Sequence, residues 1–296
     1  MTLALETQAL TKRYGRRLAL DAVDLAVEPG TVFGVIGPNG AGKTTTMRLL
    51  LDIIRPTSGS ARVLGQDPRQ GGVELRRRIG FLPGELRLEG RVTGRALLKH
   101  YAEISGPVAP GVVDSLAQRL DLDLSRQVRK LSKGNKQKLG VVQAFMHQPD
   151  LLVLDEPTSG LDPLVQQEFL TMVREAKNNG QTVFLSSHVL SEIQQAADSV
   201  AILRAGRIVT VSDVDTLRAT ALRRVNATIA DATADAVRTA FARDQHLAEL
   251  TITAGDLSIA VDGAAAIPVT INPASYPDST SLVAALQTAV DATTLN

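Results

Sequence analysis

The chain has 296 residues, of which 44% are hydrophobic and 21% are charged, an ordinary globular composition with enough apolar material for a core. Its formal net charge of +1 gives no reason to expect a nucleic-acid partner or an anionic membrane surface, and the absence of cysteine excludes disulfides and thiolate chemistry. No apolar run approaches the roughly 18 residues of a membrane span, and the charged N-terminus is unlike a signal peptide, so we expect a cytosolic chain whose membrane role comes through a partner.

The first part of the chain predicts β-structure. Residues 3–36 contain short stretches of alternating character, separated by turn signals at Tyr14–Gly15 and Pro29–Gly30. The last stretch, "TVFGVIG", is nearly all apolar, which is typical of a strand buried on both faces of a parallel sheet. A helical pattern follows at residues 42–51.

The next segments alternate between helix and strand patterns. Helical patterns dominate residues 86–148, and two more buried strands are expected in "LLVLDEP" (151–157) and "TVFLSSH" (182–188), each leading into a helix-like segment. This alternation predicts an α/β domain with a parallel sheet. After Leu222 alanine, threonine and aspartate dominate, so we place a boundary between a domain at residues 1–222 and a smaller one at residues 223–296.

A phosphate-binding loop is predicted between the buried strand and the helix that follows it. Residues 37–44, "GPNGAGKT", match G-x-x-x-x-G-K-[ST] without a mismatch. Gly40 and Gly42 let the backbone curl so that N–H groups point at phosphates, and the helix N-terminus adds positive charge. Lys43 is expected to bridge the β- and γ-phosphates, and Thr44 to hold Mg²⁺. The nucleotide-binding residues predicted from this loop are Gly37, Pro38, Asn39, Gly40, Ala41, Gly42, Lys43, Thr44 and Thr45. A glycine-rich turn without a ligand is the alternative, and the flanking strand and helix argue against it.

A pair of carboxylates ends the later buried strand "LLVLDEP". Asp155 is expected to orient the Mg²⁺ shell, since an acidic residue at a strand end beside a phosphate loop usually has this role. Glu156 is expected to act as the general base that activates water for attack on the γ-phosphate. Solvated acids at the end of a strand are the alternative, but the phosphate loop favours hydrolysis over mere binding.

With these motifs in order, residues 2–220 resemble the nucleotide-binding subunit of an ATP-binding cassette (ABC) transporter. The resemblance implies a P-loop NTPase core with a parallel sheet, an N-terminal antiparallel β-subdomain and a helical signature subdomain at about residues 83–145. A small C-terminal α+β domain would complete the fold. In this family two cassettes pack head to tail, and each ATP lies between the phosphate loop of one and the signature segment of the other.

The signature segment of the family is usually L-S-G-G-Q, and residues 131–135 read "LSKGN". By resemblance, Ser132 and Gly134 contact the γ-phosphate bound to the opposite subunit; a hydroxyl and N–H groups at a helix N-terminus favour an anion. Lys133 and Asn135 depart from the usual glycine and glutamine. The lysines of "LSKGNKQKLG" also fit an ordinary solvated helix face, but the other motifs favour the signature interpretation.

Further positions match the family. Tyr14 occupies the place of the aromatic residue that stacks on adenine, although a tyrosine before a turn more often packs. Residues 159–162, "SGLD", match the loop through which the cassettes sense each other. His188 matches the histidine that contacts the γ-phosphate. The family usually has a glutamine where this chain has Gly84, followed by Glu85. Which of these two serves that function stays open.

The variant signature and the C-terminal extension resemble the drug and polysaccharide exporter branch. That branch implies a homodimer, or a pairing with a similar cassette, on the cytoplasmic face of a separate integral membrane permease. The helical subdomain would receive a permease helix in a groove, or the same apolar side chains would fill its core. The side chains concerned are Leu86, Leu88, Val92, Leu97 and Leu98.

The C-terminal residues 223–296 predict a β-α-β-β unit in "RRVNATIA", "ATADAVRTAFA", "LAELTITA" and "LSIAVDG", followed by a helix in "STSLVAALQTAVDA". This fits a small regulatory domain of the exporter branch. The stretch from "AVDGAAAIPV" onward also resembles inserts in flagellar hook-associated and filament-capping proteins. We assign no ligand to this region.

The sequence therefore predicts an ATP-hydrolysing subunit that binds Mg²⁺ and ATP at a dimer interface and powers export. Two alternatives remain: a soluble cassette ATPase acting on ribosomes or DNA, and an ATP-sensing module with little turnover. The single cassette, without a basic arm or a long coiled-coil insertion, argues against the first. Glu156 and His188 argue against the second.

Overall fold

The computed structural model describes residues 2–86, 88–214 and 216, together with the backbone of four short strands between residues 223 and 268. The chain divides into two units, Met1–Asp215 and Thr216–Asn296, so the division lies earlier than the boundary predicted after residue 222. Each unit is described by itself.

The central sheet of the first unit has the strand order β5-β6-β7-β3-β8-β9. The first five of these strands are parallel, and β9 pairs antiparallel with β8. Every residue of β6 and β7 is buried, which explains why these strands have no polar alternation. The strands are β3 (Val32–Ile36), β5 (Ile79–Leu82), β6 (Leu151–Asp155), β7 (Thr182–Ser187), β8 (Ser199–Arg204) and β9 (Arg207–Asp213).

The register of this sheet brings three strand ends together. Ser186 of β7 pairs with Val35 of β3 on one side and with Asp155 of β6 on the other. Parallel strands point their carboxyl ends to the same edge, and loops after those ends are where ligands bind in open α/β sheets. The phosphate loop and the carboxylate pair therefore meet at one edge of the sheet.

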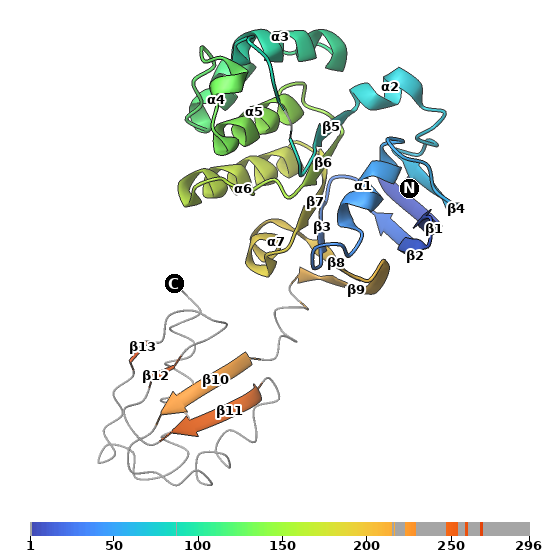
Figure 1. The fold of residues 1–296 in the computed structure, drawn as a ribbon, viewed down its shortest axis with the longest axis vertical. Coiled ribbons are helices and arrows are strands. Elements are labelled where there is room, and N and C mark those ends of the chain that lie inside the picture. The colour runs from blue at the N-terminus through green and yellow to red at the C-terminus, as the bar shows by residue number, and fades with distance from the viewer. Residues whose placement is uncertain are drawn as a thin grey trace. The chain divides into compact units, whose positions relative to one another are not determined.

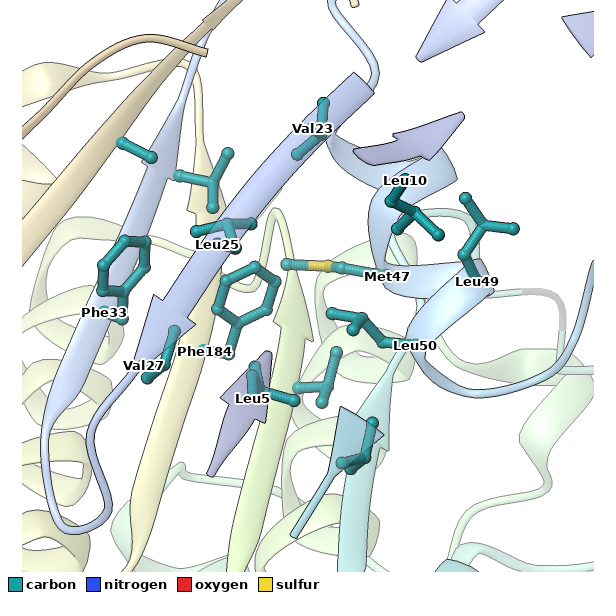
Figure 2. Close-up of a cluster of buried hydrophobic side chains, with 14 of the residues drawn as sticks. Leu5, Leu10, Val23, Leu25, Val27, Phe33, Met47, Leu49, Leu50 and Phe184 are labelled. Carbon is teal, nitrogen blue, oxygen red and sulfur yellow. The ribbon is translucent and has the colours of Figure 1, made fainter. Parts of the chain in front are cut away.

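A second sheet is antiparallel, with the order β2-β1-β4. Its strands are β1 (Leu5–Tyr14), β2 (Arg17–Val27) and β4 (Ser58–Val63). Helix α1 (Lys43–Leu50) packs in the core that joins this sheet to the central one, as Figure 2 shows around Met47. Met47 and Leu50 are each 1% exposed, and burial of one such side chain contributes about 1.5–3 kcal/mol. The core thus fixes the helix that carries the phosphate loop.

The helical part of the unit confirms the predicted helical subdomain. In Figure 1 its helices lie together at the end of the unit away from the antiparallel sheet. Thr93 caps α3 by accepting a hydrogen bond from the N–H of Ala96, and such a cap contributes about 1 kcal/mol. The elements are α3 (Gly94–Ser105), α4 (Val112–Arg119), the 3₁₀ helix η1 (Val128–Lys130) and α5 (Lys133–Phe145).

The described part of the first unit also contains the helices α2 (Gly72–Arg77), α6 (Pro163–Asn178) and α7 (Leu190–Ala196). Asp162 caps α6 through the N–H of Val165, and Pro163 occupies the first turn, where its missing N–H costs no hydrogen bond. In the described part of the chain, none of the helices has the length and apolarity that a membrane crossing requires.

The second unit is described only by the backbone of its strands. The strands β10 (Arg223–Thr228) and β11 (Leu247–Thr253) pair in parallel, and β12 (Ser258–Ile259) pairs antiparallel with β13 (Ile267–Pro268). The first three strands coincide with three predicted strands. The predicted helices in "ATADAVRTAFA" and "STSLVAALQTAVDA" lie outside the described residues.

Candidate active site

The phosphate loop follows β3 and leads directly into α1. Gly42, the cap of α1, has a φ of 117°, and Gly40 has a φ of 81°, both in the left-handed region that favours glycine. A Cβ on Gly42 would also lie 2.6 Å from the Leu20 side chain. With no acidic side chain in the first turn of α1, the exposed N–H groups form a cradle suited to an anion.

Lys43 is held at the base of this loop. Its Nζ donates a 2.6 Å hydrogen bond to the carbonyl of Gly37 and lies 3.1 Å from Oε1 of Glu156. The Lys43 side chain is only 6% exposed, and a buried ammonium is stable only with such partners. Gly37 does not line the cavity; in this structure it contributes the carbonyl that orients Lys43.

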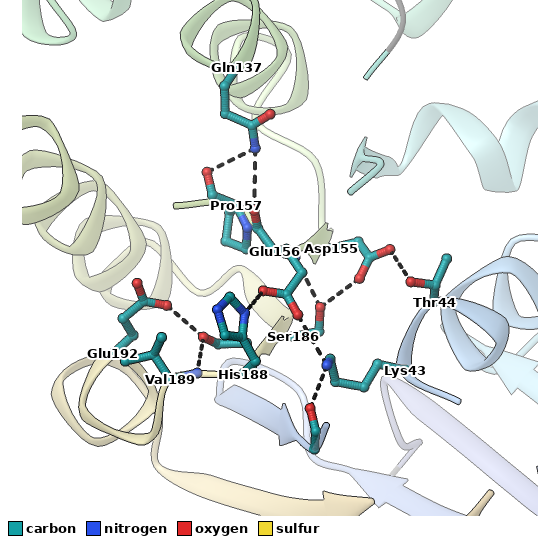
Figure 3. Close-up of polar contacts among 12 residues, drawn as sticks. Lys43, Thr44, Gln137, Asp155, Glu156, Pro157, Ser186, His188, Val189 and Glu192 are labelled. Atoms are coloured by element: carbon teal, nitrogen blue, oxygen red, sulfur yellow. Dashed lines mark hydrogen bonds and ion pairs between the residues drawn. The ribbon is translucent and has the colours of Figure 1, made fainter. Parts of the chain in front are cut away.

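Thr44 and Asp155 form the adjacent pair of oxygen groups. Thr44 Oγ1 donates to Oδ2 of Asp155 at 2.7 Å, and Ser186 Oγ donates to Oδ1 at 2.6 Å. Asp155 is 1% exposed, so these two hydroxyl donors are what stabilise its carboxylate in the interior. Figure 3 shows that Asp155 bridges the loop side chain and the strand β7 side chain.

Glu156 follows Asp155 and faces both Lys43 and His188. Its Oε2 lies 2.5 Å from Nδ1 of His188, and because an ionised carboxylate only accepts, Nδ1 is the donor in this contact. The Glu156 N–H donates to Ser186 Oγ at 3.0 Å. The resemblance implies that His188 contacts the γ-phosphate of ATP, and in the structure its ring contacts the carboxylate of Glu156 (Figure 3).

These groups line one cavity of about 820 Å³. The lining residues are Tyr14, Arg17, Ala19, Pro38, Asn39, Gly40, Ala41, Gly42, Lys43, Thr44, Thr45, Arg48, Gly84, Glu85, Asp155, Glu156, Ser159 and His188. All but one of the loop residues predicted to bind the nucleotide are among them, and so are the predicted positions Tyr14, Asp155, Glu156 and His188 and the first residue of "SGLD", Ser159. The structure therefore gathers residues from distant parts of the sequence around a single space.

Two further positions of the cavity wall were singled out by the sequence: the departure from the family at Gly84 and the match at Tyr14. Gly84 lies so close to Asp155 that a Cβ there would be 3.0 Å from Oδ2, and the neighbouring Glu85 also lines the cavity. Tyr14 is 46% exposed, and Lys12 Nζ lies 5.1 Å from its ring centroid, a distance at which a cation and a ring attract. The ring is thus accessible, as a stacking surface must be.

The signature residues lie outside this cavity. Ser132 caps α5, with its Oγ accepting from the N–H of Asn135 at 3.2 Å. Its hydroxyl proton stays available to an anion, because the cap uses only a lone pair. Gly134 packs against residue Gly160, whose carbonyl oxygen would be 2.8 Å from a Cβ at position 134. Neither Ser132 nor Gly134 lines the cavity.

Sequence reasoning missed three residues that support the site: Ser186, Gln137 and Arg17. Ser186 had a signal, since it directly follows the apolar residues Val183, Phe184 and Leu185 of a buried strand. Gln137 is 5% exposed and donates to the carbonyls of Glu156 and Pro157, at 3.4 and 3.0 Å. Arg17 lies over the phosphate loop, with Nη2 3.4 Å from where a Cβ on Gly40 would be. No local pattern in the sequence marks either of these.

The loop, the buried lysine and the carboxylates at the neighbouring strand end define a P-loop nucleotide hydrolase. Comparisons with known proteins agree. Residues 20–159 match the family described as ABC transporter. A bacitracin transport ATP-binding protein from Bacillus licheniformis is 38% identical over 74% of this chain and 72% of that protein. A daunorubicin resistance ATP-binding protein from Streptomyces coeruleorubidus is also 38% identical, over 73% and 70%.

A solved structure of the ATP-binding subunit of an ABC transporter is 31% identical, with a TM-score of 0.68 over 74% of this chain and 92% of that one. The chain therefore belongs to the ABC transporter family, as an ATP-binding subunit of the drug exporter type that hydrolyses ATP.

Proposed function

We propose that two copies of this chain close head to tail on two ATP molecules and that hydrolysis drives export through a separate membrane permease. The observation that carries the proposal is the division of the predicted site. Lys43, Asp155 and Glu156 share one cavity, whereas Ser132 lies outside it at the exposed start of α5. A second copy would supply that missing wall.

In this proposal Lys43 exchanges partners when ATP enters. Its ammonium now neutralises Glu156 Oε1, and the β- and γ-phosphates would take over that role. The freed carboxylate then accepts a proton from water as the water oxygen bonds to the γ-phosphorus and the bond to the bridging oxygen breaks. His188, already bonded to the other carboxylate oxygen, orients Glu156 throughout.

Mg²⁺ fits the residues present. Thr44 Oγ1 and Asp155 Oδ2 lie 2.7 Å apart and are hard oxygen ligands, as Mg²⁺ prefers. No group of three or more acidic, histidine or cysteine residues suited to a metal occurs in the described residues, and Mg²⁺ with phosphates needs only one or two protein ligands. When bound, the ion would neutralise charge on the phosphates, with Thr44 and Asp155 holding it.

The permease contact is proposed at the far end of α1. An apolar cleft of about 210 Å³ lies there, lined by Leu50, Ile53 and Phe81 among others, and Ile53 is 54% exposed. Because α1 begins at the phosphate loop, a shift on ATP binding reaches this cleft directly. Bound to the permease through this cleft, the chain would lie on the cytoplasmic face of the membrane. Of the side chains for which the sequence left groove and core open, Leu98 is 1% exposed and belongs to the subdomain core.

Light scattering with size-exclusion chromatography on Glu156→Gln tests the proposal. Without the general base, bound ATP persists, and we expect a dimer with ATP and Mg²⁺ and a monomer without ATP. The matched control is Glu192→Gln, which alters a nearby carboxylate that accepts from Ser187 and does not line the cavity. A Glu156→Gln chain that binds ATP yet stays monomeric would contradict head-to-tail closure by this chain alone.

A further inference from the structure

One face of α5 is fastened to the segment that carries Glu156. Gly134, Gln137 and Lys138 are spaced i, i+3 and i+4, so they share a side of the helix. Gln137 Nε2 donates to the carbonyl of Pro157 at 3.0 Å and lies 3.4 Å from that of Glu156, as Figure 3 shows. The Gln137 side chain is 5% exposed, so water does not replace these bonds.

The Glu156 backbone needs such support because it is strained. Its φ is 48°, in the left-handed region that a residue with a side chain rarely adopts. It also precedes Pro157, and a following proline disfavours helical backbone geometry. A conformation of this kind costs about 1–3 kcal/mol and persists only when its surroundings hold it. Ser186 holds the N–H of Glu156, while Gln137 holds the carbonyl side.

Two more contacts connect α5 to the same segment. The backbone at Gly134 approaches Gly160 so closely that a Cβ would lie 2.8 Å from the Gly160 oxygen. Lys138 Nζ is buried and lies 3.9 Å from Oδ2 of Asp162. Helix α5 and the segment from Glu156 to Asp162 are therefore expected to move together.

We propose that Gln137 is a positioning residue for Glu156: its amide fixes the strained Glu156–Pro157 peptide and thereby aims the carboxylate. This rests on the proposed role of Glu156 as the general base. Ser132 caps the same helix, so engagement of Ser132 by the opposite ATP reaches the general base of its own chain through Gln137. Gln137 thereby couples the two ATP sites, and it is the link that reaches Glu156 itself.

The experiment compares Gln137→Leu with Gln181→Leu in the full chain. Gln181 Nε2 also donates to a proline carbonyl, that of Pro149, but at the opposite end of β6. We expect Gln137→Leu to lower kcat at least tenfold while the Kd for ATP stays within twofold of wild type, and Gln181→Leu to leave both unchanged. Equal losses in the two variants, or a wild-type kcat in Gln137→Leu, would overturn the proposal.

A double-mutant cycle separates positioning from a merely structural role. If Gln137 acts through Glu156, Gln137→Leu lowers the single-turnover rate of wild type but not the residual rate of Glu156→Gln. The same fold loss in both backgrounds would overturn the proposal. Should Gln137→Leu fail to fold, Gln137→Asn keeps the amide but draws it back by one methylene, and the same cycle applies.

The role of Glu156 as general base and the role of Gln137 as positioning residue can be refuted separately. Glu156→Gln with wild-type turnover would remove the general base itself and with it this inference. Loss of turnover in Glu156→Gln with wild-type kcat in both Gln137 variants would leave the proposed function standing and refute only the role of Gln137.

Discussion

The phosphate loop and the signature segment belong to the same unit, yet they differ in how far one chain completes them. Lys43 is 6% exposed and has two partners from its own chain, the Gly37 carbonyl and Glu156. Ser132 is exposed, and in the described part of the chain its hydroxyl makes one hydrogen bond, the cap to the N–H of Asn135. The ammonium of Lys43 is held in place by its own chain, whereas the hydroxyl of Ser132 is free to donate to an acceptor on another molecule.

This difference shows what holds the side chain of each segment in place. A buried cation with partners is fixed by the energetics of its own fold, since an unpartnered charge in the interior is costly. An exposed cap needs only one lone pair for the helix, so the remaining hydroxyl proton serves no intramolecular purpose. Variants of the two segments should therefore fail in different ways, one within the chain and one between chains.

Lys43→Ala should produce the largest effect. It removes the charge that faces the phosphates and leaves Glu156 with one cationic partner fewer, and loss of a single stabilising donor of this kind costs about 10²–10³ in rate. We expect turnover to fall by about that factor and ATP binding by the isolated chain to weaken. Steady-state hydrolysis and equilibrium titration with ATP measure both. Lys177→Ala, which breaks an ion pair with Asp198 away from the cavity, is the control.

Ser132→Glu should have the next largest effect, and its loss of turnover should arise between chains. The added carboxylate would face the γ-phosphate of the opposite site, and like charges at an interface cost several kcal/mol. We expect turnover to fall about 10–100-fold and the ATP-dependent dimer of Glu156→Gln to disappear, while monomer binding of ATP stays within twofold.

Thr93→Glu is the matched control for that variant, since Thr93 caps α3 with the same geometry but lies outside the cavity. Both changes alter one helix cap, so both should alter stability by about 1 kcal/mol. Loss of dimer in Thr93→Glu as well would mean that altered capping, and not charge at the interface, explains the effect.

The half of the site that one chain builds by itself, the phosphate loop with the carboxylate pair, could be predicted from sequence because its residues form local motifs. Strand β3, the phosphate loop and α1 form one continuous stretch, and Asp155 directly follows an apolar run. The strands β3, β6 and β7 were predictable for the same reason, since each is an apolar run buried on both faces of the sheet. Strand β4 was missed because its residues Ser58–Val63 are mostly exposed and contain a glycine, so they show no apolar alternation.

The supporting contacts could not be predicted because they depend on register and packing. Whether Ser186 meets Asp155 is decided by the pairing of β6 with β7, which no local pattern encodes. Gln137 looks like one more polar residue in a lysine-rich helix start, and only the packing of α5 shows that it is buried. The strain at Glu156 is likewise a property of the assembled loop.

Tyr14→Ala should have a smaller effect that tests the accessible ring. Base–aromatic stacking contributes about 1–3 kcal/mol, so we expect the Kd for ATP to rise about tenfold with kcat nearly unchanged. Tyr14→Phe keeps the ring and should bind as wild type does. Equal binding of ATP by Tyr14→Ala and wild type would mean that the ring only packs and does not stack on adenine. The chain's own contacts with ATP would then be confined to the phosphates.

The smallest expected effect is on stability and comes from His147, which lies just after the end of α5, outside both the phosphate-loop site and the signature segment. Among the described residues, neither ring nitrogen has a hydrogen-bond partner of good geometry. Burial lowers the pKa of the imidazole, and weaker hydrogen bonding with backbone groups of Ile79 and Gln143 offsets this effect only in part. With the folded pKa below the unfolded one, the unfolded chain binds the extra proton first. The contribution of His147 to stability should therefore be fully present above about pH 6.5, the unfolded pKa, and should fall as the pH drops from there through the folded pKa.

Thermal unfolding of wild type and His147→Leu across pH 5–8 measures this pH dependence. The variant should lose that part of it, whereas the exposed-residue control His100→Leu should keep it. A Tm difference of a few °C is the scale, since about 1 kcal/mol shifts Tm by about 2–4 °C in a domain of this size. Because His147 lies beyond the end of the helix that Ser132 begins, ATP binding and dimer formation at neutral pH should stay as in wild type. A change in either would show that packing at the far end of α5 also sets the position of its signature end.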